Sequence, residues 1–216
     1  MRRILSIPVI AILHNPWNCA DHIRDIKPDN VAVDGGESEH PIIKLTDLEC
    51  VVHLPEGDVV DVAFGNAMWR IPEAHCKGRV NRPHDMFSFG ATVCIRTRFH
   101  TKETLIRWAS QCMWTMCGRI LFKIDKEWLH DNHDLTALYL CHRQLGFFGD
   151  EDSIEGLQKH MDDGPSCENL KTVIDTPFKP ALRWGDCDPV FQDLVCRLMN
   201  IDPAKWLTAQ EALAHP

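Results

Sequence analysis

Seven residues constrain this chain more than any other feature: Arg24-Asp25-Ile26-Lys27-Pro28-Asp29-Asn30. They bring a carboxylate, a cation and a side-chain amide close together, and the single proline restricts the backbone. Phosphoryl transfer uses such a set: a carboxylate to orient the attacking hydroxyl, a lysine for the transferred phosphate and an asparagine for Mg²⁺. Asp, Pro and Asn are also common in ordinary turns, so this segment alone leaves two interpretations open.

Four further motifs follow in the sequence. The first, Asp47-Leu48-Glu49, begins seventeen residues after Asn30 and comes directly after the apolar run Ile42-Ile43-Lys44-Leu45 and Thr46. The other three are Ile71-Pro72-Glu73, Asp85-Met86-Phe87-Ser88-Phe89-Gly90 and the segment from Asp202 to Pro216. Five motifs in this order and spacing rarely arise together by chance.

Together the five motifs resemble those of protein kinase domains, and the Asp-x-Lys-Pro-x-Asn form is similar to the Ser/Thr type. Asp47-Leu48-Glu49 resembles Asp-Phe-Gly, and Ile71-Pro72-Glu73 resembles Ala-Pro-Glu. The last two motifs resemble the start of the central helix and the final helix of the domain. The resemblance is strongest over residues 21–95 and 191–216. The segment Gly65-Asn66-Ala67-Met68-Trp69-Arg70-Ile71-Pro72-Glu73 is most similar to fungal-type kinase-like chains.

The resemblance implies an α+β, protein kinase-like fold, with a mainly helical C-terminal lobe and a small β-hairpin. It also implies ATP and Mg²⁺ as cofactors and a protein as substrate. Asp25 would orient the substrate hydroxyl, and Lys27 would contact the γ-phosphate. Asn30 and Asp47 would hold Mg²⁺.

Two positions and one segment depart from the family's pattern. Glu49 replaces a glycine whose backbone freedom lets the metal-binding Asp move, and its carboxylate would point to solvent or add a metal ligand. The segment from Asp47 to Glu73 contains no Ser, Thr or Tyr, which excludes phosphorylation within it. Trp206 replaces an arginine that pairs with the Glu of Ala-Pro-Glu, so we expect Glu73 to pair with Lys205 or Arg70, or to lie in water.

The resemblance spans one domain, residues 1–216, and begins near the helix that precedes the catalytic loop. The sequence has no Gly-rich loop and no Val-Ala-Ile-Lys strand, so we expect the C-terminal lobe only, without useful phosphoryl transfer on its own. Residues 1–13 could also be a signal peptide, but Leu13-His14-Asn15 favours the helix. The polar, basic run that starts at Arg96 indicates an insertion over about residues 96–112.

Composition narrows the classes of partner. The chain has 216 residues, 44% of them hydrophobic, and a formal net charge of −8 without a basic stripe, which argues against nucleic acid. The apolar run at residues 4–13 is too short to span a membrane. We therefore expect an intracellular protein, in the cytoplasm or nucleus.

Ten scattered cysteines favour buried reduced thiols over disulfides, and the His130/His133 pair lacks the nearby thiols of a zinc site.

The hydrophobic pattern also predicts individual elements. Residues 31–33 and 42–45 read as two short paired strands, and residues 85–95 as a buried helix. Thr208 and Glu211 fit a capping box at the start of the last helix. The acidic, glycine-containing segments 149–156 and 161–168 read as loops.

Two classes of function remain compatible with these features. The first is a protein serine/threonine kinase that transfers the γ-phosphoryl group of ATP to a protein hydroxyl. The second is an inactive kinase-like (pseudokinase) module that binds protein partners, or a truncated fragment. The retained Asp25, Lys27, Asn30 and Asp47 favour recent enzymatic ancestry, whereas the missing lobe favours the second class for this chain.

Overall fold

The computed structural model describes residues 22–23, 25–33, 43–55, 57–59, 65–80, 84–93, 122, 124, 135–161, 165–175 and 189–216. The helix expected before the catalytic loop, the insertion expected at 96–112, and His130 and His133 all lie outside the described residues.

Two small antiparallel sheets lie near the start of the chain. β2 (Val31–Val33) pairs with β3 (Ile43–Leu45), with Val31 opposite Leu45 and Ala32 opposite Lys44. This confirms the expected hairpin over these residues, and residue 42, where the second strand was expected to begin, lies outside the described residues. β1 (His22–Ile23) pairs with β4 (Val52–His53). The amide of Thr46 donates to the carbonyl of Asn30 at 2.8 Å, so the hairpin brings the residues after β3 beside the Asp25–Asn30 loop.

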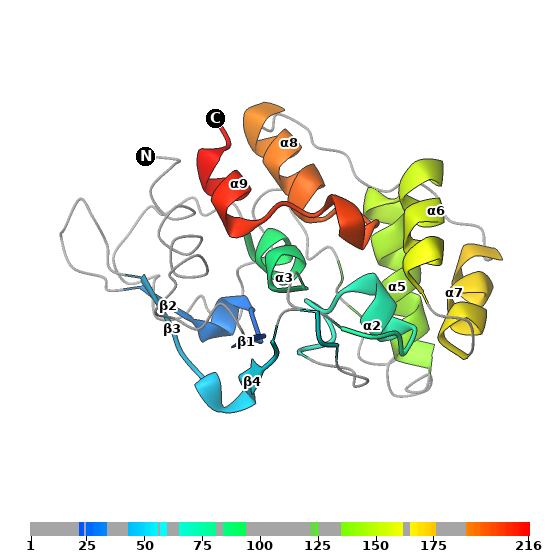
Figure 1. Cartoon of the computed structure of the whole chain (residues 1–216), viewed down its shortest axis with the longest axis horizontal. Helices are drawn as coiled ribbons and strands as arrows, with labels where there is room; N and C mark the ends of the chain where they lie inside the picture. The colour runs from blue at the N-terminus through cyan, green and yellow to red at the C-terminus, as the bar shows by residue number, and fades with distance from the viewer. Residues whose placement is uncertain are drawn as a thin grey trace.

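Helices make up most of the rest of the described structure. The α-helices are α2 (Pro72–His75), α3 (His84–Val93), α5 (Thr136–Phe148), α6 (Glu151–His160), α7 (Pro165–Asp175), α8 (Pro189–Leu198) and α9 (Ala209–Ala214). Short 3-10 turns occur at η2 (Pro28–Asn30), η3 (Leu48–Cys50) and η7 (Pro203–Lys205). Figure 1 shows the strands at one end, α5, α6 and α7 at the other, and α3 between them. The helices in these ranges are all too short or too polar to cross a membrane.

The main hydrophobic core surrounds α3. Phe87 and Phe89 are fully buried, and α3 packs against α8. A Cβ added at Gly90 would lie 2.7 Å from Met199 Cγ and 2.8 Å from Leu198 Cβ. The glycine therefore lets the two helices approach closely. The expected buried helix is confirmed over residues 85–93, and residues 94 and 95 lie outside the described residues.

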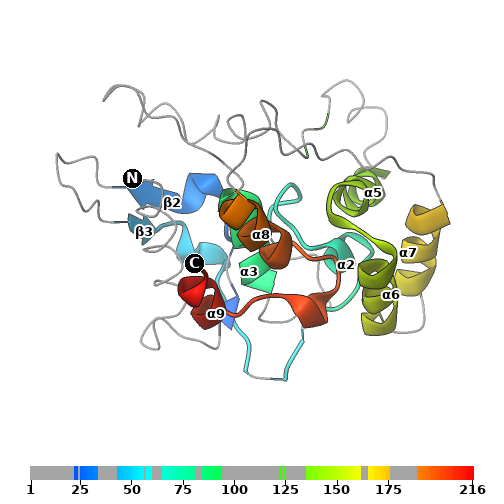
Figure 2. The same ribbon diagram turned by 90° about the horizontal axis from the view of Figure 1, so that it is seen from above.

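A second hydrophobic cluster joins α2 to α5 and α7. Its buried members are Cys76, Cys141, Leu145, Leu157, Met161, Leu170, Val173 and Ile201. Phe148 packs against both this cluster and the main core. Figure 2 shows α5, α6 and α7 together at the end of the molecule opposite β2 and β3.

The expected loops at 149–156 and 161–168 are wrong, because α6 occupies most of the first and α7 begins within the second. Asp150 and Ser153 form a capping box that starts α6. Gly156 lies inside α6 because Asp202 packs directly against it: an added Cβ would lie 2.3 Å from Asp202 Cγ. Pro165 is favourable in the first turn of α7, since the missing N–H has no helical partner there.

Candidate active site

The loop that holds Asp25 and Lys27 is fixed by two buried residues. Ile26 is 1% exposed, and Asn30 is 4% exposed. The side-chain amide of Asn30 donates to the carbonyl of Asp25 at 2.8 Å, and Pro28 begins η2. Because Ile26 and Asn30 point into the protein, the side chains of Asp25 and Lys27 are left at the surface side of the loop, where both are partly exposed.

Lys27 lies between two carboxylates. Its Nζ is 2.6 Å from Asp25 Oδ2 and 3.8 Å from Asp47 Oδ2. The hydrogen bond to Asp25 raises the pKa of Lys27, and the charge of Asp47 acts in the same direction. Lys27 is therefore a cation at neutral pH, and it lies where the Asp25–Asn30 loop meets Asp47.

The second oxygen of Asp25 is held by the segment at residue 65. The backbone amide of Asn66 donates to Asp25 Oδ1 at 2.8 Å. Gly65 precedes it with φ +76°, a conformation that favours glycine, and an added Cβ there would lie 3.4 Å from Asp25 Oδ1. The Asn66 side chain instead accepts from the amide of Met68 at 3.1 Å. The Gly65-Asn66 pair was the available sequence signal, but the role of its backbone amide was missed.

Asp47 projects its carboxylate toward solvent and Lys27. It adopts a left-handed backbone conformation, φ 55° and ψ 59°, which Asp tolerates better than most residues. Its side chain is 49% exposed, and Glu49 is exposed, as expected for a side chain that points to solvent. Glu49 lies in η3 without a positive φ, so this conformation does not require the glycine of the family's pattern.

The donors present fit Mg²⁺ only together with a phosphate ligand. Asp47 offers a half-exposed carboxylate. Asn30 is 4% exposed and its amide nitrogen donates to the Asp25 carbonyl, which leaves its amide oxygen for a metal. Oxygen ligands of these kinds suit Mg²⁺. In the part of the chain that the structure describes, no group of three His, Cys, Asp or Glu residues could hold a metal. A magnesium ion there would complete its coordination with phosphate oxygens and water.

The segment from Gly65 to Ile71 is anchored to two helices. Ser88 on α3 donates to the carbonyl of Trp69 at 2.9 Å, and Gln144 on α5 donates to the carbonyl of Arg70 at 2.6 Å. Arg70 in turn donates to the carbonyl of Gly65 at 2.6 Å. Ser88 belongs to a recognised motif, whereas no sequence signal pointed to Gln144.

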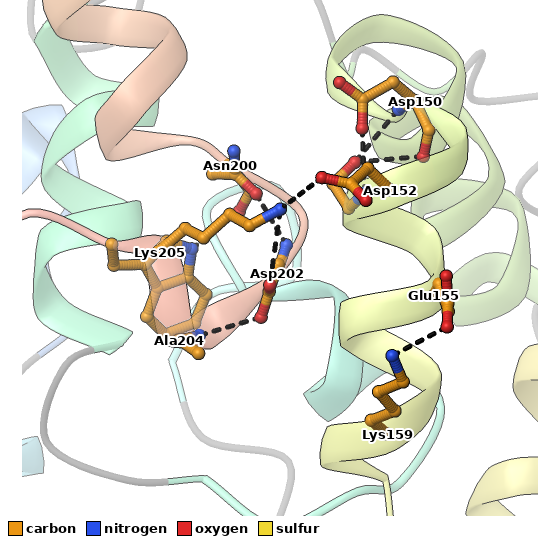
Figure 3. Close-up of polar contacts among 10 residues, drawn as sticks. Asp150, Asp152, Glu155, Lys159, Asn200, Asp202, Ala204 and Lys205 are labelled. Atoms are coloured by element: carbon orange, nitrogen blue, oxygen red, sulfur yellow. Dashed lines mark hydrogen bonds and ion pairs between the residues drawn. The ribbon is translucent and has the colours of Figure 1, made fainter.

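The expected partners of Glu73 are wrong. Glu73 is 1% exposed, and its carboxylate oxygens find no hydrogen-bond partner among the described residues. Lys205 instead contacts Asp152 at 3.1 Å and Asp202 at 3.7 Å, as Figure 3 shows. Burial raises the pKa of Glu73 to about 8, so it is largely neutral at pH 7.

Trp206 has a structural role of its own. Its indole N–H donates to the carbonyl of Asn200 at 2.6 Å, and its ring lies 5.7 Å from that of Phe87, measured between centroids. The side chain is therefore part of the main core. Because Glu73 is largely protonated at pH 7, it carries little charge and needs no cationic partner.

Comparison with known proteins gives two matches to this chain. A family model described as "Protein kinase domain" matches residues 10–216. The phosphorylase b kinase gamma catalytic chain, liver/testis isoform, of Bos taurus is 25% identical over 219 residues. That alignment covers 100% of this chain and 38% of the bovine protein, so the chain spans well under half the length of this relative.

Proposed function

Because this chain belongs to the protein kinase family, we propose that it carries the catalytic residues of a Ser/Thr-type domain, whose reaction transfers the γ-phosphoryl group of ATP to a protein hydroxyl. The observation that supports this most directly is the way Asp25 is held. One of its oxygens contacts Lys27 Nζ and the other accepts from the amide of Asn66. A carboxylate fixed at both oxygens is already oriented for a substrate hydroxyl.

In the proposed reaction, the substrate hydroxyl oxygen bonds to the γ-phosphorus while the bond to the bridging oxygen of ADP breaks. Asp25 orients that hydroxyl and accepts its proton. Lys27 supplies a positive charge beside the transferred group, and its position 3.8 Å from Asp47 keeps the lysine near the phosphate site as well. Mg²⁺, held by Asp47 and Asn30, would neutralise phosphate charge when bound with the nucleotide.

Preference for Ser and Thr is part of the proposal. It rests on Lys27, two residues after Asp25, in the Asp-x-Lys-Pro-x-Asn pattern, and on the similarity to a relative named as a phosphorylase b kinase catalytic chain. Phosphoamino-acid analysis of a labelled generic substrate would find phosphoserine and phosphothreonine. Phosphotyrosine as the main product would contradict this part of the proposal.

The test is transfer of radiolabelled γ-phosphate to a generic protein substrate, with residues 1–216 and with the longest protein that the gene encodes. In the protein that transfers phosphate, the nearly isosteric Asp25→Asn should reduce the rate of transfer roughly 10²–10⁴-fold, which is the usual contribution of general acid–base catalysis. The matched control is Asp29→Asn, an exposed carboxylate in the same loop, which should keep the wild-type rate.

Binding of a fluorescent ATP analogue with and without Mg²⁺ separates the outcomes. Equal loss of transfer in Asp25→Asn and Asp29→Asn would point to a damaged loop rather than to catalysis. Absence of Asp25-dependent transfer from both proteins, with ATP unbound, would favour the protein-binding module instead.

A further inference from the structure

Two cysteines meet inside the protein, on either side of the contact between α2 and α5. Cys76 directly follows α2, and Cys141 lies in α5. Their sulfur atoms are 3.6 Å apart, although the residues are separated by 65 positions in the sequence. Both thiols are free and 0% exposed, within the second hydrophobic cluster.

The surroundings hold the two thiols in place. On the α2 side, the amide of Cys76 donates to the carbonyls of Pro72 and Glu73, and its own carbonyl accepts from Asn169 on α7. On the α5 side, Cys141 is followed one turn later by Leu145, which is also fully buried. The sulfurs therefore face each other from two packed helical elements rather than from mobile loops.

We propose that Cys76 and Cys141 form a modification site, in which a small oxidant such as hydrogen peroxide closes an intrachain disulfide between α2 and α5. The first thiolate attacks a peroxide oxygen; the O–O bond breaks and hydroxide leaves, becoming water with the thiol's proton. The second thiol then attacks the sulfenic sulfur, the S–O bond breaks and a second water leaves. Two electrons pass from the sulfurs to the peroxide.

Burial controls the rate of this reaction. The hydrogen bond to Cys76, together with desolvation, raises the pKa of Cys141, so its thiolate form is scarce in the closed protein. Oxidation therefore follows brief opening of the contact between α2 and α5, and the disulfide forms as the contact closes again. Cys167 and Cys196 are partly exposed and therefore react first.

The disulfide would link α5 covalently to the segment from Gly65 to Cys76, in which the amide of Asn66 binds Asp25. Cys76 lies ten residues after Asn66, and Gln144, one turn after Cys141, already binds the carbonyl of Arg70. Cross-linking α2 to α5 therefore restricts the whole segment from Gly65 to Cys76. This inference stands apart from the proposed phosphoryl transfer, since its test needs no activity.

Peptide mapping tests the site directly. Trypsin releases Cys76 in the peptide 71–77 and Cys141 in the peptide 127–143, each with a single cysteine. After treatment of the native protein with peroxide and blocking of free thiols, mass spectrometry should find these two peptides linked, and dithiothreitol should separate them. The oxidised protein should melt roughly 5–10 °C higher than the reduced one, because the bond closes a long loop.

Two variants and two controls make the result specific. Cys76→Ala and Cys141→Ala should each abolish the linked peptide and the rise in melting temperature, whereas Cys167→Ala and Cys196→Ala should leave both unchanged. Linkage of either cysteine to a different partner, or oxidation of Cys76 and Cys141 to sulfinic acid without linkage, would overturn the proposal. The proposal would also be overturned if the peptides 71–77 and 127–143 stayed unmodified by peroxide in mild urea while Cys167 and Cys196 reacted.

Discussion

Glu73 illustrates how burial alone can set the charge of a residue. Its carboxyl group is 1% exposed without a hydrogen-bond partner in the described structure, and burial raises its pKa to about 8. At a pH between about 4.5 and about 8, Glu73 therefore keeps its proton in the folded protein and releases it in the unfolded chain. The free energy of unfolding therefore falls as pH rises from about 4.5 to about 8.

We expect Glu73→Gln to remove this pH dependence. Between pH 6.5 and pH 8 the wild-type protein should lose roughly 2 kcal/mol relative to the variant, since one pKa unit corresponds to about 1.4 kcal/mol. Below pH 6.5, His75 and His84 act with the opposite sign, because burial lowers their pKa values to about 3 and about 4. Urea unfolding of both proteins across this range measures the difference.

The control is Glu155→Gln, at a side chain that is 59% exposed on α6. It removes one carboxylate from the surface, so its stability relative to wild type should change little with pH. A pH-independent difference between wild type and Glu73→Gln would mean that Glu73 is ionised in the folded protein and has a partner.

A second prediction at this scale concerns Gly156. Helix propensity alone favours Gly156→Ala by about 1 kcal/mol. However, the new Cβ would lie 2.3 Å from Asp202 Cγ, and Asp202 is fixed because it accepts from the amide of Ala204 at 3.0 Å. Overpacking of this kind costs about 1–3 kcal/mol, so we expect a net loss of roughly 1 kcal/mol by chemical denaturation. Gln158→Ala, exposed on the same helix, should be neutral or slightly stabilising.

The residues expected to carry the chemistry could be predicted from the sequence more readily than the burial and contacts of the residues around them. Asp25, Lys27, Asn30 and Asp47 could be named because each stands in a short motif, and the structure brings them to one place. The burial of Glu73 without a hydrogen-bond partner among the described residues could not be predicted, because it depends on helices that are distant in the sequence. Their chemical roles stay predictions until transfer is measured.

At the scale of elements, capping decides where α6 begins. Asp150 accepts from the amide of Ser153 at 2.8 Å, and the Ser153 hydroxyl accepts from the amide of Asp150 at 3.0 Å. Loss of one such side-chain cap costs about 1 kcal/mol. We therefore expect Asp150→Ala to lower the free energy of unfolding by about that amount, as measured by urea titration at neutral pH.

Asp152→Ala provides the comparison in the same first turn. Asp152 is 86% exposed and contacts Lys205 at 3.1 Å, and exposed ion pairs contribute little. Its loss should therefore cost less than the loss of Asp150. The Ser153 hydrogen bonds lower the pKa of Asp150, so the advantage of Asp150 is present at neutral pH and is lost as the pH falls through its folded value. Equal costs for both variants would argue against the capping box.

Elements with a strong local pattern were predictable. The β2–β3 hairpin and α3 follow from apolar runs, and the capping box of α9 follows from Thr208 and Glu211, whose contacts confirm it. α6 and α7 were missed because glycine and acidic residues are typical of loops as well. The contact that makes Gly156 suitable comes from Asp202, 46 positions away, where no local pattern could reveal it.

At the scale of the whole molecule, α3 and Phe122 both contribute to the main core. α3 ends at Val93, and Phe122 is 1% exposed, with its ring edge-on to that of Phe147 at 5.9 Å between centroids. The order of the motifs predicted the family and the fold. The pairing of α2 with α5 was not predictable, because Cys76–Cys141 and Arg70–Gln144 contacts join residues 65 and 74 positions apart.

The last prediction concerns residues 96–112, which we propose are an insertion between α3 and Phe122. Arg96, Arg98 and Lys102 follow the buried part of α3, and burial of an unpaired cation costs several kcal/mol. Deletion of 96–112, with a short Gly/Ser linker in their place, should leave the melting temperature unchanged or higher, because a shorter loop costs less entropy to close. The matched control is Phe122→Ala, which should destabilise by about 3–5 kcal/mol. If the deletion were as damaging as Phe122→Ala, these residues would belong to the core and the domain would lack an insertion there.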